Sequence, residues 1–218
     1  MFTCAFLTAC YTGMRTGEVF ALTWNDIDLK NRIIKINKTV YAKDKEKKGR
    51  WYLGTTKTAG SCREVYICDT LYLVLSNYKK LQNEYKKEYG KKYKRYFLEK
   101  VKNKYGKLIE YRVIESNSNR NIIEMVFTRK DGTYSGTDIV RYPFKIIHYE
   151  LGIKCRFYDL RGSFATISLR NGCEIKDISD VLGHKRIETT EKYYISSTSE
   201  DKKKVVKRFE YGINNKIL

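Results

Sequence analysis

The sequence predicts a mixed α+β fold that is predominantly α-helical and contains a small three-stranded antiparallel sheet. Two patterns predict this class. Apolar residues recur at helical spacing near both ends of the chain, and residues 32–68 alternate between apolar and polar side chains as β-strands do. The chain has 218 residues, of which 42% are hydrophobic, so it is long enough to bury a core in one large domain or two small ones.

The first segment is expected to form two helices. Residues 1–11 are apolar on nearly every side, which predicts a buried helix that ends at Gly13. The next helix is expected at about 16–23, with Thr12 or Thr16 as its N-cap. Because the chain begins inside the first helix without a capping residue, we expect a segment upstream of this chain.

The three predicted strands come next. The run "RIIKINKTVYA" alternates and predicts one strand over 32–42. "RWYLGTTKTAGSCREVYIC" predicts two more strands over 50–68, joined by a turn at 58–61. Between the first and second strands, the charged stretch 43–50 is expected to be a solvated loop.

The second half of the chain again predicts helices. Apolar residues at helical spacing predict a long helix over about 70–99. "MVFTRKDGTYSG", residues 125–136, predicts a short strand and a turn, and "DIVRYPFKIIHYELGI", residues 138–153, predicts a helix with Pro143 near its start. Three short helices and a basic amphipathic tail helix complete the prediction, at 158–171, 174–182, 187–194 and 199–211.

The charge balance indicates the class of partner. Lys and Arg number 44 and Asp and Glu 25, which gives a net charge of +19. An excess of this size favours a polyanionic partner, nucleic acid first and an acidic membrane second. The 19 tyrosines are either half-buried aromatics or a surface that stacks on bases. The Lys- and Tyr-rich end of the long predicted helix is likewise either a solvated surface or a nucleic-acid surface.

Cysteine and histidine usage argues against a metal site. No C-x-x-C pair occurs, only two histidines are present, and the cysteine spacing does not resemble a secreted disulfide framework. No basic leader precedes the apolar start, and no stretch approaches the length of a membrane span. We therefore expect a cytoplasmic protein with reduced thiols, no metal and no cofactor. The six thiols are Cys4, Cys10, Cys62, Cys68, Cys155 and Cys173.

Two basic residues stand at notable places in the first half. In "TGMRTGEVFAL", Arg15 and Glu18 lie three residues apart and share one helix face. They are either a surface ion pair or part of an anion site, since Arg15 opens a helix whose first N–H groups point outward. In "GTTKTAGSCREV", Lys57 lies near the tip of the predicted hairpin. Taken alone, Lys57 is weak evidence, because the chain has very many lysines.

Two further motifs lie near the end of the chain. In "YDLRGSFAT", Tyr158 and Arg161 share one helix face, and Asp159 is a candidate cap. In "LGHKRIETTEKYY", a glycine permits a left-handed turn, after which His184 is expected to be exposed. Tyr193 follows nine residues later. Each motif has an ordinary structural explanation by itself, so their significance depends on the set.

Together, these four stretches resemble the catalytic domain of the tyrosine recombinases, the phage and mobile-element integrase family. The resemblance covers about residues 3–197, and its most specific part is Leu-Gly-His followed by Thr-Thr and then by Tyr nine residues after the His. It implies a tyrosine recombinase catalytic-domain fold over 1–198, with 84–124 as an insertion. It also implies that an upstream core-binding domain is absent from this chain. The tail 199–218 is expected to dock onto a neighbouring protomer, or else to pack on its own domain.

The resemblance implies a role for each motif residue. Two arginines bind the scissile phosphate, a hairpin lysine and a histidine assist, and Tyr193 is the nucleophile, with Tyr194 as a less favoured candidate. At position 158 the family usually has a histidine or sometimes a lysine, so the tyrosine there is a departure. We expect activity to survive this departure, with more of the proton transfer carried by the histidine and the lysine. The implied catalytic set is Arg15, Lys57, Tyr158, Arg161, His184 and Tyr193, with Glu18 in support.

The function implied by the resemblance is site-specific DNA recombination. The tyrosine attacks a DNA phosphate to give a 3′-phosphotyrosyl link, and strand exchange follows without metal or ATP. The implied partners are double-stranded DNA, a homo-oligomer that is a tetramer on DNA, and accessory DNA-bending or directionality factors. The alternatives are a type IB topoisomerase-like nicking-closing enzyme, a non-catalytic DNA-binding relative, and a basic RNA-binding protein. The Lys-, Ile-, Asn- and Tyr-rich composition suggests an AT-rich bacterial genome, with a conjugative transposon or prophage as the source.

Overall fold

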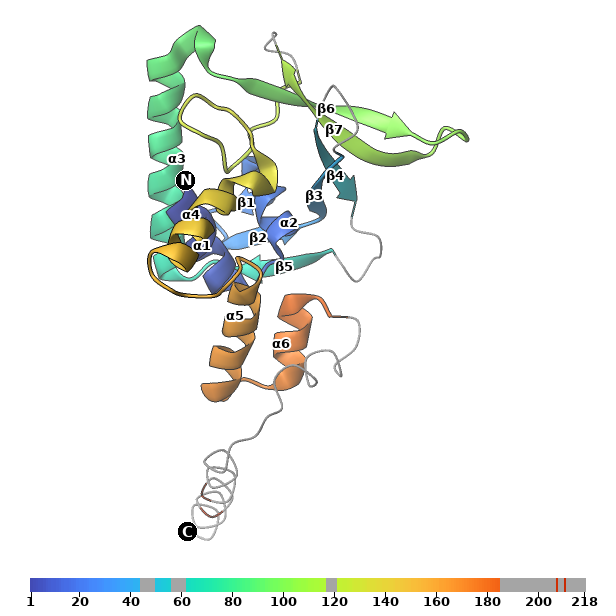
Figure 1. The fold of residues 1–218 in the computed structure, drawn as a ribbon. Coiled ribbons are helices and arrows are strands. Elements are labelled where there is room, and N and C mark those ends of the chain that lie inside the picture. The colour runs from blue at the N-terminus through green and yellow to red at the C-terminus, as the bar shows by residue number, and fades with distance from the viewer. Residues whose placement is uncertain (44–49, 56–61, 117–120, 185–206, 208–209, 211–218) are drawn as a thin grey trace.

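The computed structural model describes most of the chain (Figure 1). The described residues are 1–43, 50–55, 62–116 and 121–184, together with the isolated positions 207 and 210. The expected turn at 58–61 and the expected helix at 187–194 lie outside them. The expected tail helix at 199–211 also lies outside them, apart from the two isolated positions.

The described residues form helices and antiparallel strands, so the mixed α+β class is confirmed. The α-helices are α1 (Phe2–Thr12), α2 (Thr16–Phe20), α3 (Asp69–Tyr89), α4 (Arg141–Tyr149), α5 (Asp159–Arg170) and α6 (Ile175–Leu182). The strands are β1 (Ile27–Asp28), β2 (Ile33–Ile36), β3 (Lys38–Ala42), β4 (Trp51–Thr55), β5 (Arg63–Tyr66), β6 (Arg95–Lys102) and β7 (Leu108–Ser116).

The strands form two sheets where the sequence predicts one. One sheet has the order β1-β2-β5 and the other β3-β4-β7-β6. The predicted strand over 32–42 keeps its alternation, with Ile34, Ile36 and Val40 all buried. Its pairing nevertheless changes partner at Asn37: β2 pairs with β5, whereas β3 pairs with β4. Side-chain alternation records which face is buried and not which strand lies alongside, so this change leaves no trace in the pattern.

The predicted helix over 70–99 is wrong in its second half. Helix α3 ends at Tyr89, where Gly90 adopts a positive φ of 51°. The chain then returns as β6 and β7, a hairpin whose turn is held by Asn103. Its side-chain Oδ1 accepts hydrogen bonds from the backbone N–H groups of Tyr105 and Lys107, at 2.9 and 3.0 Å. The hairpin joins the second sheet through the pairing of β7 with β4.

Two smaller expectations in the second half have different outcomes. Residues 125–136 contain the expected turn, in which the Gly132 N–H donates to the Arg129 carbonyl at 2.9 Å. They form no regular strand, since Met125 makes only an isolated bridge with Thr23. The helix expected over 138–153 is present as a 3-10 turn, Gly136–Val140, that continues into α4. Pro143 stands in the first turn of α4, where a missing N–H costs nothing.

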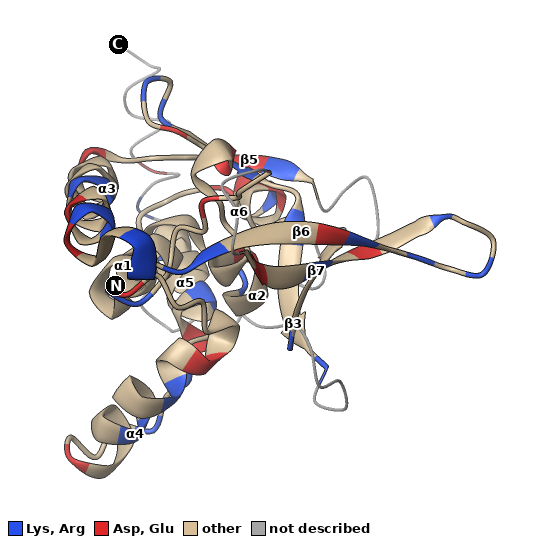
Figure 2. Cartoon of the chain, turned by 90° about the horizontal axis from the view of Figure 1, so that it is seen from above, with Lys and Arg blue, Asp and Glu red and all other residues tan. Residues whose placement is uncertain are grey.

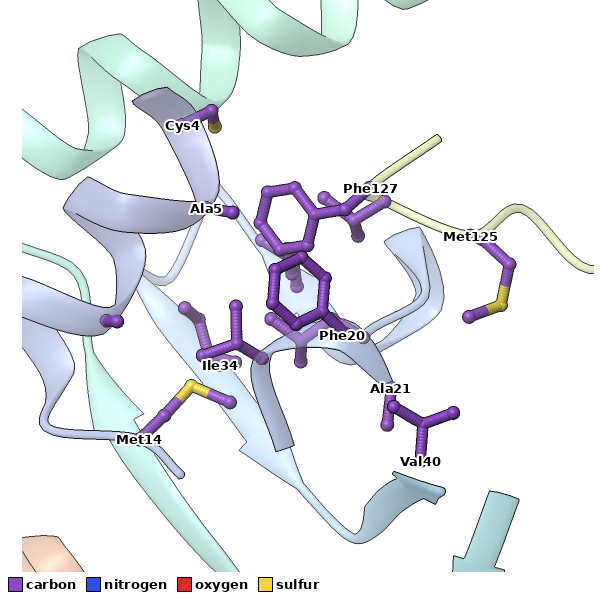
Figure 3. Close-up of a cluster of buried hydrophobic side chains, with 14 of the residues drawn as sticks. Cys4, Ala5, Met14, Phe20, Ala21, Ile34, Val40, Met125 and Phe127 are labelled. Carbon is purple, nitrogen blue, oxygen red and sulfur yellow. The ribbon is translucent and has the colours of Figure 1, made fainter. Parts of the chain in front are cut away.

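One hydrophobic core holds α1, α2, both sheets and α3 together. At its centre, Phe20 of α2 packs edge-on against Phe127 with ring centroids 5.7 Å apart (Figure 3). Met14, Ile34 and Val40 surround them, and all five side chains are buried. Helix α1 buries one side, with Cys4, Ala5 and Ala9, in this core, while Tyr11 is 43% exposed, so the helix is not buried all round.

A second, smaller core joins α5 to α6. It consists of Ala165, Ile178 and Leu182, with Phe164 packed against them. The two helices lie side by side below the main body and contact it at α1 and β5 (Figure 1). This docking brings the end of α6 next to the start of α2, which the sequence separates by more than half the chain.

Basic residues are spread widely over the surface. Figure 2 shows Lys and Arg along α3 and at the far end of the β6–β7 hairpin, with acidic residues interspersed. In the described part of the chain, every helix is too short or too polar to cross a bilayer.

Candidate functional site

The first turn of α2 is stabilised by the side chain of Glu18 and not by a threonine cap. Arg15 is the N-cap residue, with an extended backbone, and its N–H donates to Glu18 Oε2 at 2.9 Å. Neither Thr12 nor Thr16 caps this helix as expected. Thr12 donates its hydroxyl to the Thr8 carbonyl, and Thr16 is the first helical residue. A carboxylate in the first turn of a helix compensates the unpaired N–H groups and the positive end of the helix dipole.

Glu18 is a buried junction between two arginines. Its side chain is only 4% exposed, so the interpretation of a surface ion pair is wrong. Arg15 Nη1 donates to Oε1 at 2.9 Å, and Arg63 Nη1 and Nη2 donate to Oε1 and Oε2 at 3.1 and 2.8 Å. Burial raises the pKa of Glu18, but hydrogen bonds and charge from both arginines outweigh it and hold the pKa below its ordinary value.

Arg63 is the site residue that the sequence prediction missed. It opens β5 and lies opposite Ile36 of β2, with its side chain 8% exposed. The residue stands inside the stretch "TKTAGSCREV", so the motif contains it. The signal that marks it is its place on the alternating strand: Arg63 and Val65 are on one face, and Val65 is buried. A lone arginine on a buried strand face needs a partner, and Glu18 supplies it.

Arg161 lies deep between α1 and α6. The residue is 2% exposed; its Nη1 donates to the Gly13 carbonyl at 2.8 Å and its Nη2 to the Leu182 carbonyl at 2.7 Å. These contacts within the described residues use two of its five N–H donors. Burial, and then the neighbouring charge of Arg15, lowers the pKa of Arg161 to about 10.

The start of α5 differs from the expectation at Asp159. The N-cap is Tyr158, and Asp159 is the first helical residue. Its Oδ2 accepts the backbone N–H of Arg156 at 2.8 Å, and its Oδ1 pairs with Arg156 Nη2 at 2.8 Å. Tyr158 itself is 52% exposed, one turn of chain from buried Arg161. The tyrosine side chain is therefore accessible to solvent.

The C-terminal end of α6 is bound by three arginines. Arg63 Nε donates to the Val181 carbonyl at 2.7 Å, and Arg161 donates to the next carbonyl, Leu182. Arg15 Nη2 makes a longer contact, 3.4 Å, with the carbonyl of Gly183. The last carbonyls of a helix lack partners within it and carry the negative end of its dipole, which explains why cations gather there.

His184 follows this helix end directly. Gly183 adopts the expected left-handed conformation, φ 67°, and the backbone N–H of His184 donates to the Ser179 carbonyl at 3.0 Å. The expectation that His184 is exposed is wrong, since it is half-buried. Burial, followed by the charges of Arg161, Arg15 and Arg63, lowers its pKa to about 4. The imidazole is therefore neutral at pH 7.

The structure thus gathers five residues of the predicted set and leaves two outside the described residues. Arg15, Glu18, Arg161 and His184 lie together, with Tyr158 at the same end of α5, whereas Lys57 and Tyr193 lie outside, as does Tyr194. Guanidinium groups beside a neutral imidazole are suited to hold a phosphate, because forked N–H donors match its oxygens. Within the described part of the chain, no group of three His, Cys, Asp or Glu residues is placed to hold a metal ion.

The low pKa of His184 predicts a loss of stability in acid. Between about pH 6.5 and pH 4, the unfolded chain binds a proton at this imidazole that the folded protein excludes. The free energy of unfolding should therefore fall as the pH drops through this window, and this residue should contribute no pH dependence above it. Urea unfolding of the wild type and of His184→Gln at several pH values measures it.

The second histidine provides the control for this prediction. His148 lies on α4, and His148→Gln should retain the wild-type slope between pH 6.5 and 4. His184→Gln should flatten that slope, with the remaining dependence due to carboxylates such as Glu18. An unchanged slope in His184→Gln would contradict the assignment.

Comparison with known proteins gives consistent matches. The model of the phage integrase family matches residues 2–200. The chain is similar to a XerC-like tyrosine recombinase of Caldanaerobacter subterraneus subsp. tengcongensis, with 27% identity over 195 residues that cover 87% of this chain and 44% of that protein. It is also similar to the ICEBs1 integrase of Bacillus subtilis, with 27% identity over 191 residues, 87% of this chain and 43% of that protein. The chain therefore spans less than half the length of these relatives.

Solved structures share the fold. An integrase of the transposon Tn1549 in complex with a circular intermediate DNA aligns with a TM-score of 0.68 at 16% identity, over 94% of this chain and 58% of that one. XerA recombinase aligns with a TM-score of 0.57 at 19% identity, over 94% and 57%. A family match along nearly the whole sequence, on a fold that these recombinases share, places the chain in the phage integrase family.

Proposed function

We propose that this chain carries the catalytic centre of a site-specific DNA recombinase that cleaves and rejoins DNA through a tyrosine. The observation that carries the proposal is the meeting of Arg15, Arg161 and His184, which come from three distant stretches of the chain. An ordinary helical core has no need for three charged or polar side chains at one point. A phosphodiester does, because its reaction builds up negative charge that positioned donors stabilise.

The arginines act on the phosphate. Arg15 is the more accessible of the two, with its side chain 37% exposed, and it offers the non-bridging oxygens the N–H donors that Glu18 and the Gly183 carbonyl do not use. Arg161 contributes through donors not used by the Gly13 and Leu182 carbonyls, and its charge lies in a poorly solvated position where it acts strongly. Both favour the more negative pentavalent transition state over the ground state.

The nucleophile is Tyr193 and the general acid is Lys57. The phenol gives its proton to the neutral imidazole of His184 as its oxygen bonds to phosphorus. The bond from phosphorus to the 5′ oxygen breaks, and that oxygen takes a proton from Lys57. Nearby cations favour the phenolate over the phenol. The phosphotyrosyl link retains the energy of the phosphodiester, so a 5′-hydroxyl from another duplex reverses the step without ATP or a metal.

His184 and Tyr158 complete the set as neutral groups. A neutral imidazole donates one hydrogen bond to a phosphate oxygen and keeps the other nitrogen as an acceptor. An anion bound beside His184 raises its pKa, which makes proton transfer easier once the DNA is in place. Tyr158 supplies a hydroxyl donor in place of the family's usual histidine.

The proposed partner is double-stranded DNA at specific recombination sites, with a homo-tetramer as the working assembly. The net charge of +19 supports a DNA partner, because each neutralised phosphate releases counterions and adds affinity. The Tn1549 integrase was solved with DNA, which supports the same substrate here. We further propose a mobile element as the source and accessory DNA-bending or directionality factors as additional partners.

The test is a nicked suicide duplex that carries the element's own recombination site. The full-length wild type should form an SDS-stable protein–DNA adduct, because the nicked strand is lost and cannot be rejoined. Tyr193→Phe should form none, since a phenyl ring has no oxygen to attack phosphorus, and it should still bind the duplex in a gel-shift assay. Tyr194→Phe is the matched control and should retain the adduct.

Other outcomes would support other functions. Loss of the adduct in Tyr194→Phe alone would move the nucleophile to Tyr194. Absence of any adduct on a verified site, with binding intact, would indicate the non-catalytic DNA-binding relative, for which Tyr158 is the one sequence feature. Relaxation of supercoiled DNA without regard to site would indicate a topoisomerase-like enzyme.

A further inference from the structure

Arg63 binds two parts of the site that lie far apart in the sequence. Its Nη1 and Nη2 grip the Glu18 carboxylate in a forked pair, while its Nε donates to the Val181 carbonyl in the last turn of α6. These three contacts, at 2.7 to 3.1 Å, are all short enough to be strong. The side chain is 8% exposed, so Arg63 faces the protein rather than a DNA backbone.

Each end of this bridge leads to a residue of the proposed phosphate site. Glu18 accepts from both the guanidinium and the backbone N–H of Arg15. Val181 stands three residues before His184, on the helix end that carries it. The direct link between these two halves is weaker, because Arg15 Nη2 reaches the Gly183 carbonyl only at 3.4 Å.

The Arg63 side chain also packs closely against the C-terminal end of α6. A Cβ atom at Gly183 would lie 3.0 Å from Arg63 Cδ and 3.1 Å from its Nη1. The Arg63 side chain therefore lies directly against the backbone of the residue before His184. A lysine cannot reproduce this arrangement. The planar guanidinium has separate N–H donors for the carboxylate and the carbonyl, whereas a lysine has a single ammonium group.

We infer that Arg63 is a positioning residue for DNA cleavage, which fixes Arg15 and His184 relative to each other by joining Glu18 to the end of α6. The inference rests on the proposed function and adds to it a residue outside the proposed catalytic set. Arg63 need not touch the DNA. Displacement of a catalytic group by about 1 Å can cost roughly 10²-fold in rate, so loss of this bridge should reduce cleavage strongly.

The first test compares Arg63→Lys with Glu64→Gln in the full-length protein. Glu64 is the next residue of β5, and its one ion pair with a described residue is an exposed 3.9 Å contact with Lys35, so its variant is the matched control. Under single-turnover conditions on the suicide duplex, Arg63→Lys should form adduct about 10²-fold more slowly, with DNA affinity within about threefold of wild type. Glu64→Gln should match the wild type in both.

A second variant tests the other end of the bridge. Glu18→Gln keeps the shape of the junction but weakens its hydrogen bonds to Arg63, so it should show the same loss of rate in protein that circular dichroism shows to be folded. Because both residues act through one unit, the double variant should be little slower than the worse single variant. Additive losses would overturn the inference, as would an Arg63→Lys variant that is folded and cleaves at the wild-type rate.

A third readout does not require DNA cleavage. The imidazole NMR signal of His184 should shift and broaden in Arg63→Lys, since the end of α6 loses an attachment, and should stay unchanged in Glu64→Gln. An unchanged His184 signal in Arg63→Lys overturns the inference whatever the protein does on DNA. A shifted signal together with a wild type that forms no adduct would instead retain the positioning role and reject the proposed cleavage function.

Discussion

Replacing Arg161 with alanine is expected to lower the rate of DNA cleavage by at least about 10²–10³-fold, the usual effect of removing one donor that stabilises transition-state charge. DNA binding should remain close to wild type, because one charge in a chain of net charge +19 contributes little to overall affinity. The rate of adduct formation on the suicide duplex and a gel-shift assay measure the two quantities separately.

The same substitution is also expected to destabilise the fold. Arg161 satisfies the carbonyls of Gly13 and Leu182, and each charge-assisted bond of this kind contributes about 1.5–3 kcal/mol. Part of that gain is offset in the wild type by the free-energy cost of burying the Arg161 guanidinium beside Arg15. The lowered pKa of Arg161 reflects the same cost. We therefore expect a net loss of about 2 kcal/mol, seen as a melting temperature lower by about 4–8 °C.

The control for Arg161→Ala is Arg156→Ala. Arg156 lies on the same segment, but its side chain is 79% exposed and its pair with Asp159 is a surface ion pair. Its loss should change the melting temperature by less than about 2 °C and leave cleavage unaltered. If Arg161→Ala cleaved DNA within tenfold of wild type, Arg161 would not be a phosphate-binding residue.

Replacing Gly13 with alanine is expected to destabilise the protein by about 2–4 kcal/mol. Gly13 has a φ of 63°, a region that costs an L-residue about 1 kcal/mol or more. The added Cβ would also lie 2.6 Å from Leu182 Cδ2 and 2.8 Å from Phe164 Cδ1. Leu182 is fully buried and has little room to move aside, so we expect α5 and α6 to shift away from α1.

Urea unfolding measures this effect, and Gly106→Ala separates its two causes. Gly106 also has a positive φ, 76°, but a Cβ there would meet nothing within 4 Å. Its variant should therefore lose only the backbone contribution, about 1 kcal/mol. Cleavage should fall in Gly13→Ala alone, since the shift of α5 and α6 moves Arg161 and His184 relative to Arg15. Equal losses of stability in the two variants would contradict the packing argument.

The sequence correctly predicted those helices whose apolar residues recur at regular spacing within one segment. Helices α1, α5 and α6 lie within two residues of their predicted positions, because apolar spacing and the bounding glycines are properties of the segment itself. The extension of α3 to residue 99 failed for the opposite reason. Strand β6 exists because β7 pairs with it, and a Lys- and Tyr-rich run suits a helix as well as a strand. The Asn and Gly at 103 and 106 were the available turn signal.

The candidate site divides in the same way. The order of Arg15, Arg161 and His184 along the chain was enough to nominate them, because a motif records residue type and spacing. Burial at the site was not predictable: Arg15 and Glu18 could equally have been a surface ion pair, and His184 was expected to be exposed. Arg63 was missed because the alternation of β5 places it on the face of Val65 without indicating a partner, and only the docking of α6 over β5 reveals its partners.

The amino-acid sequence alone determined the class of fold, the family and the identity of the residues proposed to act on DNA. The tertiary structure decided which sheet each strand joins, where α3 ends, and that three arginines bind successive carbonyls at the end of α6. The physical reason is range. Side-chain period, capping and motif spacing act within a few residues, whereas strand pairing and the burial of charge depend on partners that are distant in the sequence.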